Sequence, residues 1–244
     1  MKTFLRISMF TAAFMVLLGS NGYPQDALAI LKKMDEVMFS AKDVSGKQRI
    51  VLIDKNGKQE TREGAMMQKG TDKRIFRFTS PASQAGISVL SLPNDVMYLY
   101  LPAFGKERRI ASSAKNQKFS GTDFSYEDME STSYSDKYTP TLSSTEADVY
   151  VLELAPKSGS VYSKIVVRVN KTSYYPNQME YYDRGGNKVK VAQYTFSRVG
   201  NYWSASEVEM TDLKTNHKTK MQMLDVRYDT GVSDDEFTVR KLKQ

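Results

Sequence analysis

The sequence has 244 residues, of which 40% are hydrophobic, 26% charged and 11% aromatic, and its formal net charge is +7. This is enough chain for one globular domain with a sizeable core. The absence of cysteine excludes disulfides, thiol catalysis, cysteine–zinc sites and a lipidated N-terminal cysteine. The single histidine, His217, excludes multi-histidine metal sites and weakens any Ser–His–Asp proposal. Two function classes remain: an enzyme that uses carboxylate side chains, and a protein that binds without catalysing a reaction.

Residues 1–22 have the features of a secretory signal peptide. Lys2 and Arg6 form a basic start, and the apolar run over residues 7–18 is too short to span a bilayer comfortably. We expect cleavage near Gly22 and export to the periplasm, with an uncleaved anchor as the alternative. In an exported protein we expect no nucleic acid partner.

Residues 24–41 are predicted to form an amphipathic helix. Pro24 and Asp26 suit a helix start. Apolar residues recur at helical spacing on one face, which must be buried against another element. The members of this face are Ala27, Ile30, Leu31, Met34, Val37, Met38 and Ala41.

After the helix, the hydrophobic period changes to two, which predicts about eleven strands joined mostly by short turns. The expected strands lie within residues 47–55, 58–69, 72–79, 86–92, 95–101, 107–111, 148–155, 161–170, 177–183, 188–198, 202–212 and 217–228. Short turns imply antiparallel neighbours. The polar region 112–146 interrupts the pattern and is predicted to be an insertion with a short helix near residues 123–129.

The expected fold is therefore mainly β with few helices. A single antiparallel sheet of this size should curl into a half-open β-barrel, covered by the N-terminal helix and by the loop and helix insertion. Residues 23–244 are expected to form one domain and a monomer.

Apolar residues on both faces of several strands leave two interpretations open: a packed core, or a concave face that lines an apolar cavity. Ten methionines outside residues 1–22 favour the cavity, because methionine adapts to varied apolar ligands. Which face of each strand lines the cavity is left open. The candidate cavity residues are Ile30, Leu31, Met34, Met38, Phe76, Phe78, Met97, Tyr98, Leu99, Tyr100 and Leu101.

A basic group follows the aromatic strand at residues 95–101. Lys106, Arg108 and Arg109 come directly after the turn at Phe104 and Gly105. They form either a solvated edge or a rim that meets acidic lipid head groups or a membrane-protein partner.

Catalytic patterns are weak. Ser112 and Lys115 have Ser-x-x-Lys spacing, but its companion motifs are absent. Acidic residues gather between Asp123 and Glu130, where Thr122 and Asp123 are expected to cap a helix. His217 is interpreted as an exposed pairing residue. The sequence therefore predicts no enzyme, no metal and no cofactor.

Two stretches resemble the outer membrane lipoprotein-sorting proteins of the LolA-like superfamily. They are residues 96–110 (VMYLYLPAFGKERRI) and 119–128, with the block GTDFSYED as the most specific part. Further similar stretches start at Tyr162, Tyr175 and Tyr202, and the resemblance covers nearly all of residues 23–244.

The resemblance implies a half-open antiparallel barrel around a hydrophobic cavity, without catalysis or a required cofactor. It implies a periplasmic carrier that binds acyl chains of lipoproteins or lipids and transfers them toward the outer membrane. An inner-membrane transporter or exporter and an anionic membrane surface are possible partners. The alternative is an envelope sensor or adaptor of the same fold that binds a protein partner.

Overall fold

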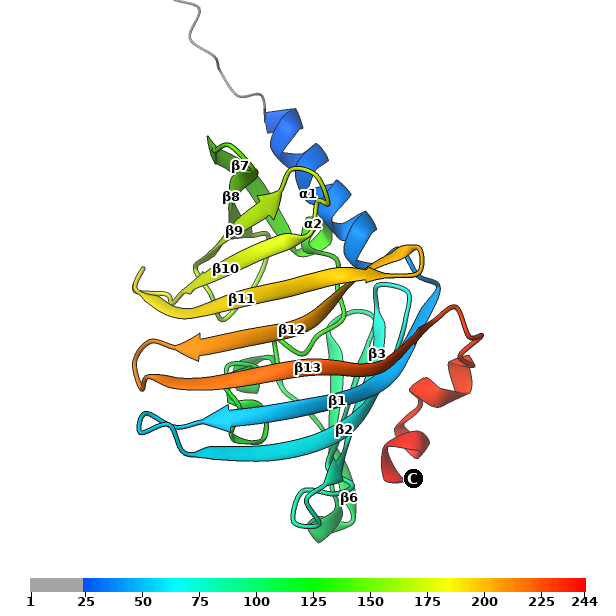
Figure 1. The fold of residues 1–244 in the computed structure, drawn as a ribbon. Helices are drawn as coiled ribbons and strands as arrows, with labels where there is room; N and C mark the ends of the chain where they lie inside the picture. Colours follow the sequence, from blue (N-terminus) through cyan, green and yellow to red (C-terminus); the bar gives the residue numbers. More distant parts are fainter. Residues whose placement is uncertain (1–23) are drawn as a thin grey trace, which may run out of the picture.

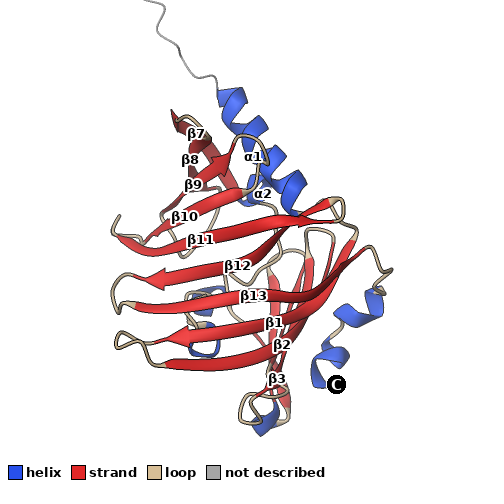
Figure 2. Cartoon of the chain, viewed as in Figure 1, coloured by secondary structure: helices blue, strands red, loops and turns tan. Residues whose placement is uncertain are grey.

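One curled antiparallel sheet dominates the molecule (Figure 1). The structure is a computed structural model that describes residues 24–244, and within them all thirteen strands belong to this sheet (Figure 2). The strand order is β6-β5-β4-β3-β2-β1-β13-β12-β11-β10-β9-β8-β7, so β6 and β7 are edge strands and the sheet is not closed into a barrel. The expected fold class is confirmed.

The strands alternate with short turns along the chain. Their bounds are β1 (Asp43–Ile53), β2 (Gln59–Lys69), β3 (Lys73–Ser80), β4 (Ser88–Leu92), β5 (Val96–Leu101), β6 (Lys106–Arg109), β7 (Tyr138–Thr145), β8 (Val149–Pro156), β9 (Lys164–Asn170), β10 (Pro176–Tyr182), β11 (Lys188–Val199), β12 (Tyr202–Asp212) and β13 (His217–Tyr228).

The topology consists of two meanders, β1–β6 and β7–β13, that are joined where β1 pairs with β13. This pairing runs from Val44 opposite Tyr228 to Ile53 opposite Lys218. Because β6 and β7 lie at opposite edges, the chain between them must cross the concave face. We call residues 110–137 the crossing segment.

Helix α1 (Pro24–Met38) lies beside the β7 end of the sheet and packs against β7, β12 and α2 (Tyr134–Lys137), the short helix that ends the crossing segment (Figure 1). Its face of Ala27, Ile30, Leu31 and Met34 is buried in the main core. The buried carboxylate of Asp35 accepts hydrogen bonds from the backbone N–H groups of Tyr134 (2.8 Å) and Ser135 (2.7 Å). The two helices are therefore joined by a side chain that binds a helix N-terminus.

The C-terminal residues cover the convex face of β3, β4 and β5. They form two 3-10 helices, η4 (Asp234–Phe237) and η5 (Val239–Lys243). Phe237 and Leu242 are buried with Ile75 and Leu90 in a second, smaller core. The Ser88 hydroxyl, which is buried, donates to the Leu242 carbonyl at 2.6 Å.

The structure departs from the sequence expectations in three elements. There are thirteen strands and not about eleven: the expected insertion over 112–146 also contains β7, whose polar sequence and Pro140 conceal it. Proline is tolerated there because β7 is an edge strand. Residues 123–129, which were expected to form a helix, form a series of turns. The short α-helix of this region is α2, which lies further along the chain. Helix α1 ends at Met38, where the Ser40 hydroxyl bonds the Val37 carbonyl at 3.2 Å.

The predicted export signal, residues 1–22, lies outside the described residues. None of the helices in residues 24–244 is both long and apolar enough to cross a membrane.

The second core predicts that the C-terminal residues contribute to stability. Leu242 is fully buried, so Leu242→Ala should lower the free energy of unfolding by about 2–5 kcal/mol through lost burial and a residual cavity. Leu213 is 43% exposed, and Leu213→Ala should stay within about 0.5 kcal/mol. Urea unfolding measures both. Equal effects of the two substitutions would show that the C-terminal residues are not part of the cooperative fold.

Candidate functional site

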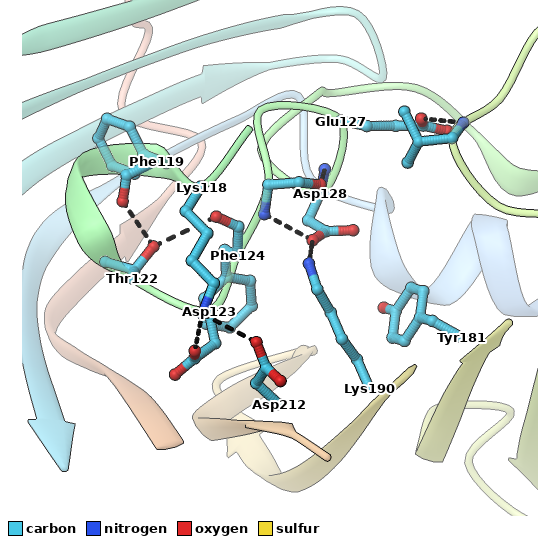
Figure 3. A network of polar contacts seen from close by, with 12 residues as sticks. Lys118, Phe119, Thr122, Asp123, Phe124, Glu127, Asp128, Tyr181, Lys190 and Asp212 are labelled. Atoms are coloured by element: carbon cyan, nitrogen blue, oxygen red, sulfur yellow. Dashed lines mark hydrogen bonds and ion pairs between the residues drawn. The ribbon is translucent and has the colours of Figure 1, made fainter. Parts of the chain in front are cut away.

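A fully buried carboxylate, Asp123, fixes the crossing segment to the concave face. It accepts hydrogen bonds from the Thr219 hydroxyl (2.8 Å) and Lys118 Nζ (2.8 Å), and His217 Nδ1 lies at 2.5 Å. Lys118 also pairs with Asp212 at 2.9 Å (Figure 3). Burial lowers the pKa of Lys118, but its bonds to the two carboxylates outweigh burial and leave that pKa raised. The segment is thus joined to β12 and β13.

Asp123 and His217 therefore differ from the sequence interpretation. Asp123 does not cap a helix; it is bound by side chains of β13 and by Lys118. The His217 side chain is 24% exposed and touches the buried Asp123. The role of both residues is anchoring.

Two further carboxylates join the crossing segment to neighbouring parts of the same meander. Asp128 accepts hydrogen bonds from the Tyr162 hydroxyl (2.9 Å) and from Lys190 of β11 (3.2 Å; Figure 3). Glu127 accepts hydrogen bonds from the Ser160 hydroxyl (2.6 Å) and the Val161 backbone N–H (2.8 Å). Lys190 and residues 160–162 thereby hold the segment at β11 and at the loop before β9, beside the β12 and β13 contacts of Asp123.

Lysine side chains also neutralise the acidic residues near the end of the crossing segment. Lys137 lies 2.8 Å from a Glu127 oxygen and 2.7 Å from a Glu130 oxygen. Glu130 also pairs with Lys115, and both of these side chains are buried. Lys115 therefore takes part in a structural ion pair.

Between the crossing segment and the sheet lies a cavity of about 270 Å³. Seven tyrosines and five methionines line it, together with Phe39, Phe76, Phe124 and Trp203. The hydroxyls of Tyr134, Tyr181 and Tyr194 all point at the buried sulfur of Met179, at 3.4, 3.6 and 3.5 Å. The wall therefore combines adaptable apolar side chains with phenol groups that can donate hydrogen bonds.

One cation in the wall lacks an acidic partner. Arg74 of β3 lines the cavity, and no Asp or Glu oxygen within residues 24–244 lies within 4.0 Å of its guanidinium. Its Nε (3.0 Å) and Nη2 (2.6 Å) donate to Gln68 Oε1, and its Nη1 donates to the Glu130 carbonyl at 3.4 Å. Burial lowers the pKa of Arg74, against the opposing influence of nearby tyrosines.

The structure divides the eleven sequence-nominated cavity residues among three places. Two, Met38 and Phe76, line the cavity. Those packed in or against the main core on the concave side are Ile30, Leu31, Met34, Phe78, Met97, Leu99 and Leu101. Tyr98 and Tyr100 face the opposite way and pack against the second core beneath the C-terminal residues.

The basic group nominated as a rim lies on edge strand β6. Lys106, Arg108 and Arg109 are exposed, and none of them forms an ion pair with another residue of the described chain. Phe104, in the turn before them, is 73% exposed. An aromatic ring and three free cations therefore share one end of the molecule.

Sequence reasoning missed the cavity tyrosines and Arg74. Tyr162, Tyr181 and Tyr194 come from separate segments that only the sheet brings together. The sequence did contain a signal for Arg74. Alternate residues of a strand share a face, so Arg74 lies on the same face of β3 as the buried side chains of Phe76 and Phe78.

The buried phenols predict alkaline sensitivity. Burial raises the pKa of Tyr194 to about 12 and those of Tyr134 and Tyr181 well above 10.0. Because the folded state holds these protons more tightly, their stabilising contribution is complete below about pH 10 and is lost as the pH rises toward 12. Urea unfolding at successive pH values should show this fall, and Tyr194→Phe should lessen it more than Tyr100→Phe. Phenolate absorbance from all cavity tyrosines near pH 10, with the fold intact, would contradict it.

Three solved structures have the same fold. The chain is 28% identical to an outer membrane lipoprotein-sorting protein domain from Vibrio parahaemolyticus, with a TM-score of 0.85 over 91% of this chain and 100% of that one. It is 26% identical to a DUF1329 family protein from Desulfovibrio piger ATCC 29098, with a TM-score of 0.84 over 89% and 98%. A LolA superfamily protein from Nitrosomonas europaea is 23% identical, with a TM-score of 0.76 over 88% and 98%.

A comparison with curated proteins gives no match. A family model with the description "Uncharacterized protein" matches residues 70–244. The chain therefore belongs to the family that this model describes, and the solved structures confirm the LolA-like resemblance that its sequence carries.

Proposed function

We propose that the protein is a periplasmic carrier that binds acyl chains of lipoproteins or lipids in the cavity and transfers them toward the outer membrane. The observation that carries the proposal is the cavity of about 270 Å³ between the sheet and the crossing segment. The likeness to a lipoprotein-sorting domain supports it. In this proposal the protein acts without catalysis and requires no cofactor.

The physical task of such a carrier is to hide apolar surface from water. Each exposed CH₂ group costs about 0.8 kcal/mol, so an acyl chain crosses water very slowly without a shield. Methionine and aromatic side chains offer that shield, and Met38 and Phe76 are the nominated residues that reach the cavity.

The crossing segment gives this cavity a fixed wall. Asp123 and Asp128 anchor it to the adjacent strands β11, β12 and β13 through Thr219, Lys190 and the Lys118–Asp212 pair. A wall that is anchored at several points keeps the space open, whereas an unanchored loop would collapse into it.

Export and a membrane-facing end complete the proposal. The signal features of residues 1–22 support export to the periplasm. Exposed Phe104 beside Lys106, Arg108 and Arg109 would meet an anionic membrane surface or an inner-membrane transporter.

Filling the cavity should abolish acyl-chain binding without unfolding the protein. Val208 of β12 lines the cavity, opposite Tyr194 on one neighbouring strand and Met221 on the other. Val208→Trp should lower affinity for a fluorescent long-chain amphiphile at least about tenfold, since burial of even two CH₂ groups is worth more than that. Gln193→Trp, on the exposed face of β11, is the matched control and should bind normally.

Thermal melts of both variants test folding, and fluorescence titration tests binding. If the unaltered protein binds no amphiphile, or if Val208→Trp binds as well as Gln193→Trp, the carrier proposal fails. The sensor or adaptor reading would then replace it, with a protein partner in place of an acyl chain.

The basic end should bind anionic vesicles. Each basic residue near an anionic membrane contributes about 1 kcal/mol, so changing Lys106, Arg108 and Arg109 to Gln should weaken vesicle binding on the order of 100-fold. The matched control changes three exposed basic residues that form no ion pair in the described chain, Lys214, Arg227 and Arg240. Co-sedimentation with vesicles at low and high salt gives the readout. Equal effects of the two triple substitutions would show that the β6 group is only a solvated edge.

A further inference from the structure

Every carboxylate in the cavity wall has a lysine partner, whereas one arginine in the wall has no carboxylate partner in the described chain. Each of the three lining carboxylates has a lysine partner: Glu127 pairs with Lys137, Glu130 with Lys137 and Lys115, and Asp128 with Lys190. The three carboxylates and their three lysine partners balance, and of these lysines Lys137 lines the cavity. Arg74, which has no carboxylate within 4.0 Å in residues 24–244, gives this set of wall residues and ion-pair partners one net positive charge.

Arg74 is held in position without being neutralised. Gln68 lies opposite it on β2, and the Gln68 side-chain oxygen accepts two of its N–H groups. A third N–H donates to the Glu130 carbonyl at 3.4 Å. A guanidinium has five N–H groups, so one on each terminal nitrogen remains without an acceptor in the described chain. These two donors can meet an acidic group from a ligand.

Tyrosines line the same cavity as Arg74, among them Tyr134, Tyr175 and Tyr194. The hydroxyls of Tyr134 and Tyr194 donate to the Met179 sulfur, so the donors offered to a ligand are those of Arg74. An unpaired buried charge is costly, and an oppositely charged, hydrogen-bonded partner removes that cost.

We propose that the cavity takes up an amphiphile with an acidic head group, a carboxylate or a phosphate, which pairs with Arg74 while its acyl chain lies along the methionine and aromatic side chains. This rests on the proposed carrier function and names the ligand class. The cavity of about 270 Å³ lies just below the ~300–1,000 Å³ range of small-molecule sites, so it suits one small amphiphile. The acylated end of a lipoprotein, which carries no acid, lacks the group that Arg74 would bind.

The test compares three fluorescent probes with the same acyl chain: a free fatty acid, its methyl ester and an alkyl phosphate. The unaltered protein should bind the fatty acid or the phosphate at least about tenfold more tightly than the ester, the size expected of charge-assisted hydrogen bonds. The tighter of the two acidic probes identifies the head group.

Substitutions then assign the preference to Arg74. Arg74→Met should bring the ratio of acid to ester affinity close to one while the ester still binds. Arg74→Lys retains the charge and should retain a preference for the acidic probes. Arg227→Met, on the exposed surface, removes the same charge and should leave the ratio unchanged.

The outcomes separate the two proposals. Equal binding of acid and ester by the unaltered protein overturns the acidic-ligand inference and leaves the carrier standing. A preference that survives in Arg74→Met also overturns it. Binding of none of the probes by the unaltered protein overturns the carrier proposal itself and the inference with it. If Arg74→Met fails to fold, the ratio of acid to ester affinity in the unaltered protein still decides the acidic-ligand inference.

Discussion

The chain leaves the sheet at one edge strand and re-enters it at the other, so residues 110–137 must cross the concave face. Such a segment carries backbone and side-chain polar groups into the interior, where each needs a partner. Asp123 and Asp128 meet that need by bonding to side chains of β13 and β11. The same bonds fix where the segment lies over the concave face, and the cavity lies between the segment and the sheet.

This arrangement explains why so many charged side chains are buried along the crossing segment. Buried ion pairs add little to stability but strongly penalise any arrangement that separates them, so they fix where the segment lies. Lys190 of β11 serves this purpose by pairing with Asp128, while Lys137 pairs with Glu127 and Glu130 within the segment. Arg74 is the exception, because Gln68 positions it and no acid within residues 24–244 lies within 4.0 Å of its guanidinium. A charge that is positioned and left without a counter-ion fits a ligand that brings one.

Local sequence patterns predicted the features that depend on residues close together in the chain. The helical spacing of Ile30, Leu31 and Met34 identified the buried face of α1, and period two located twelve of the thirteen strands. β7 was not predicted, because an edge strand tolerates polar residues and proline and its sequence therefore shows little hydrophobic alternation. The cavity could not be read in this way: its tyrosines meet through pairing between separate strands, and the C-terminal cover that buries the Tyr98 face of β5 shows no strong apolar periodicity.

Mass spectrometry of the intact protein, isolated from its native envelope under non-denaturing conditions, tests the central claim most directly. The account predicts one acidic amphiphile bound per chain, released on unfolding, and absent when Val208→Trp fills the cavity. Isolation of the unaltered protein without any bound amphiphile, or with the same amphiphile retained by Val208→Trp, would contradict the claim that the space beneath the crossing segment is a ligand site.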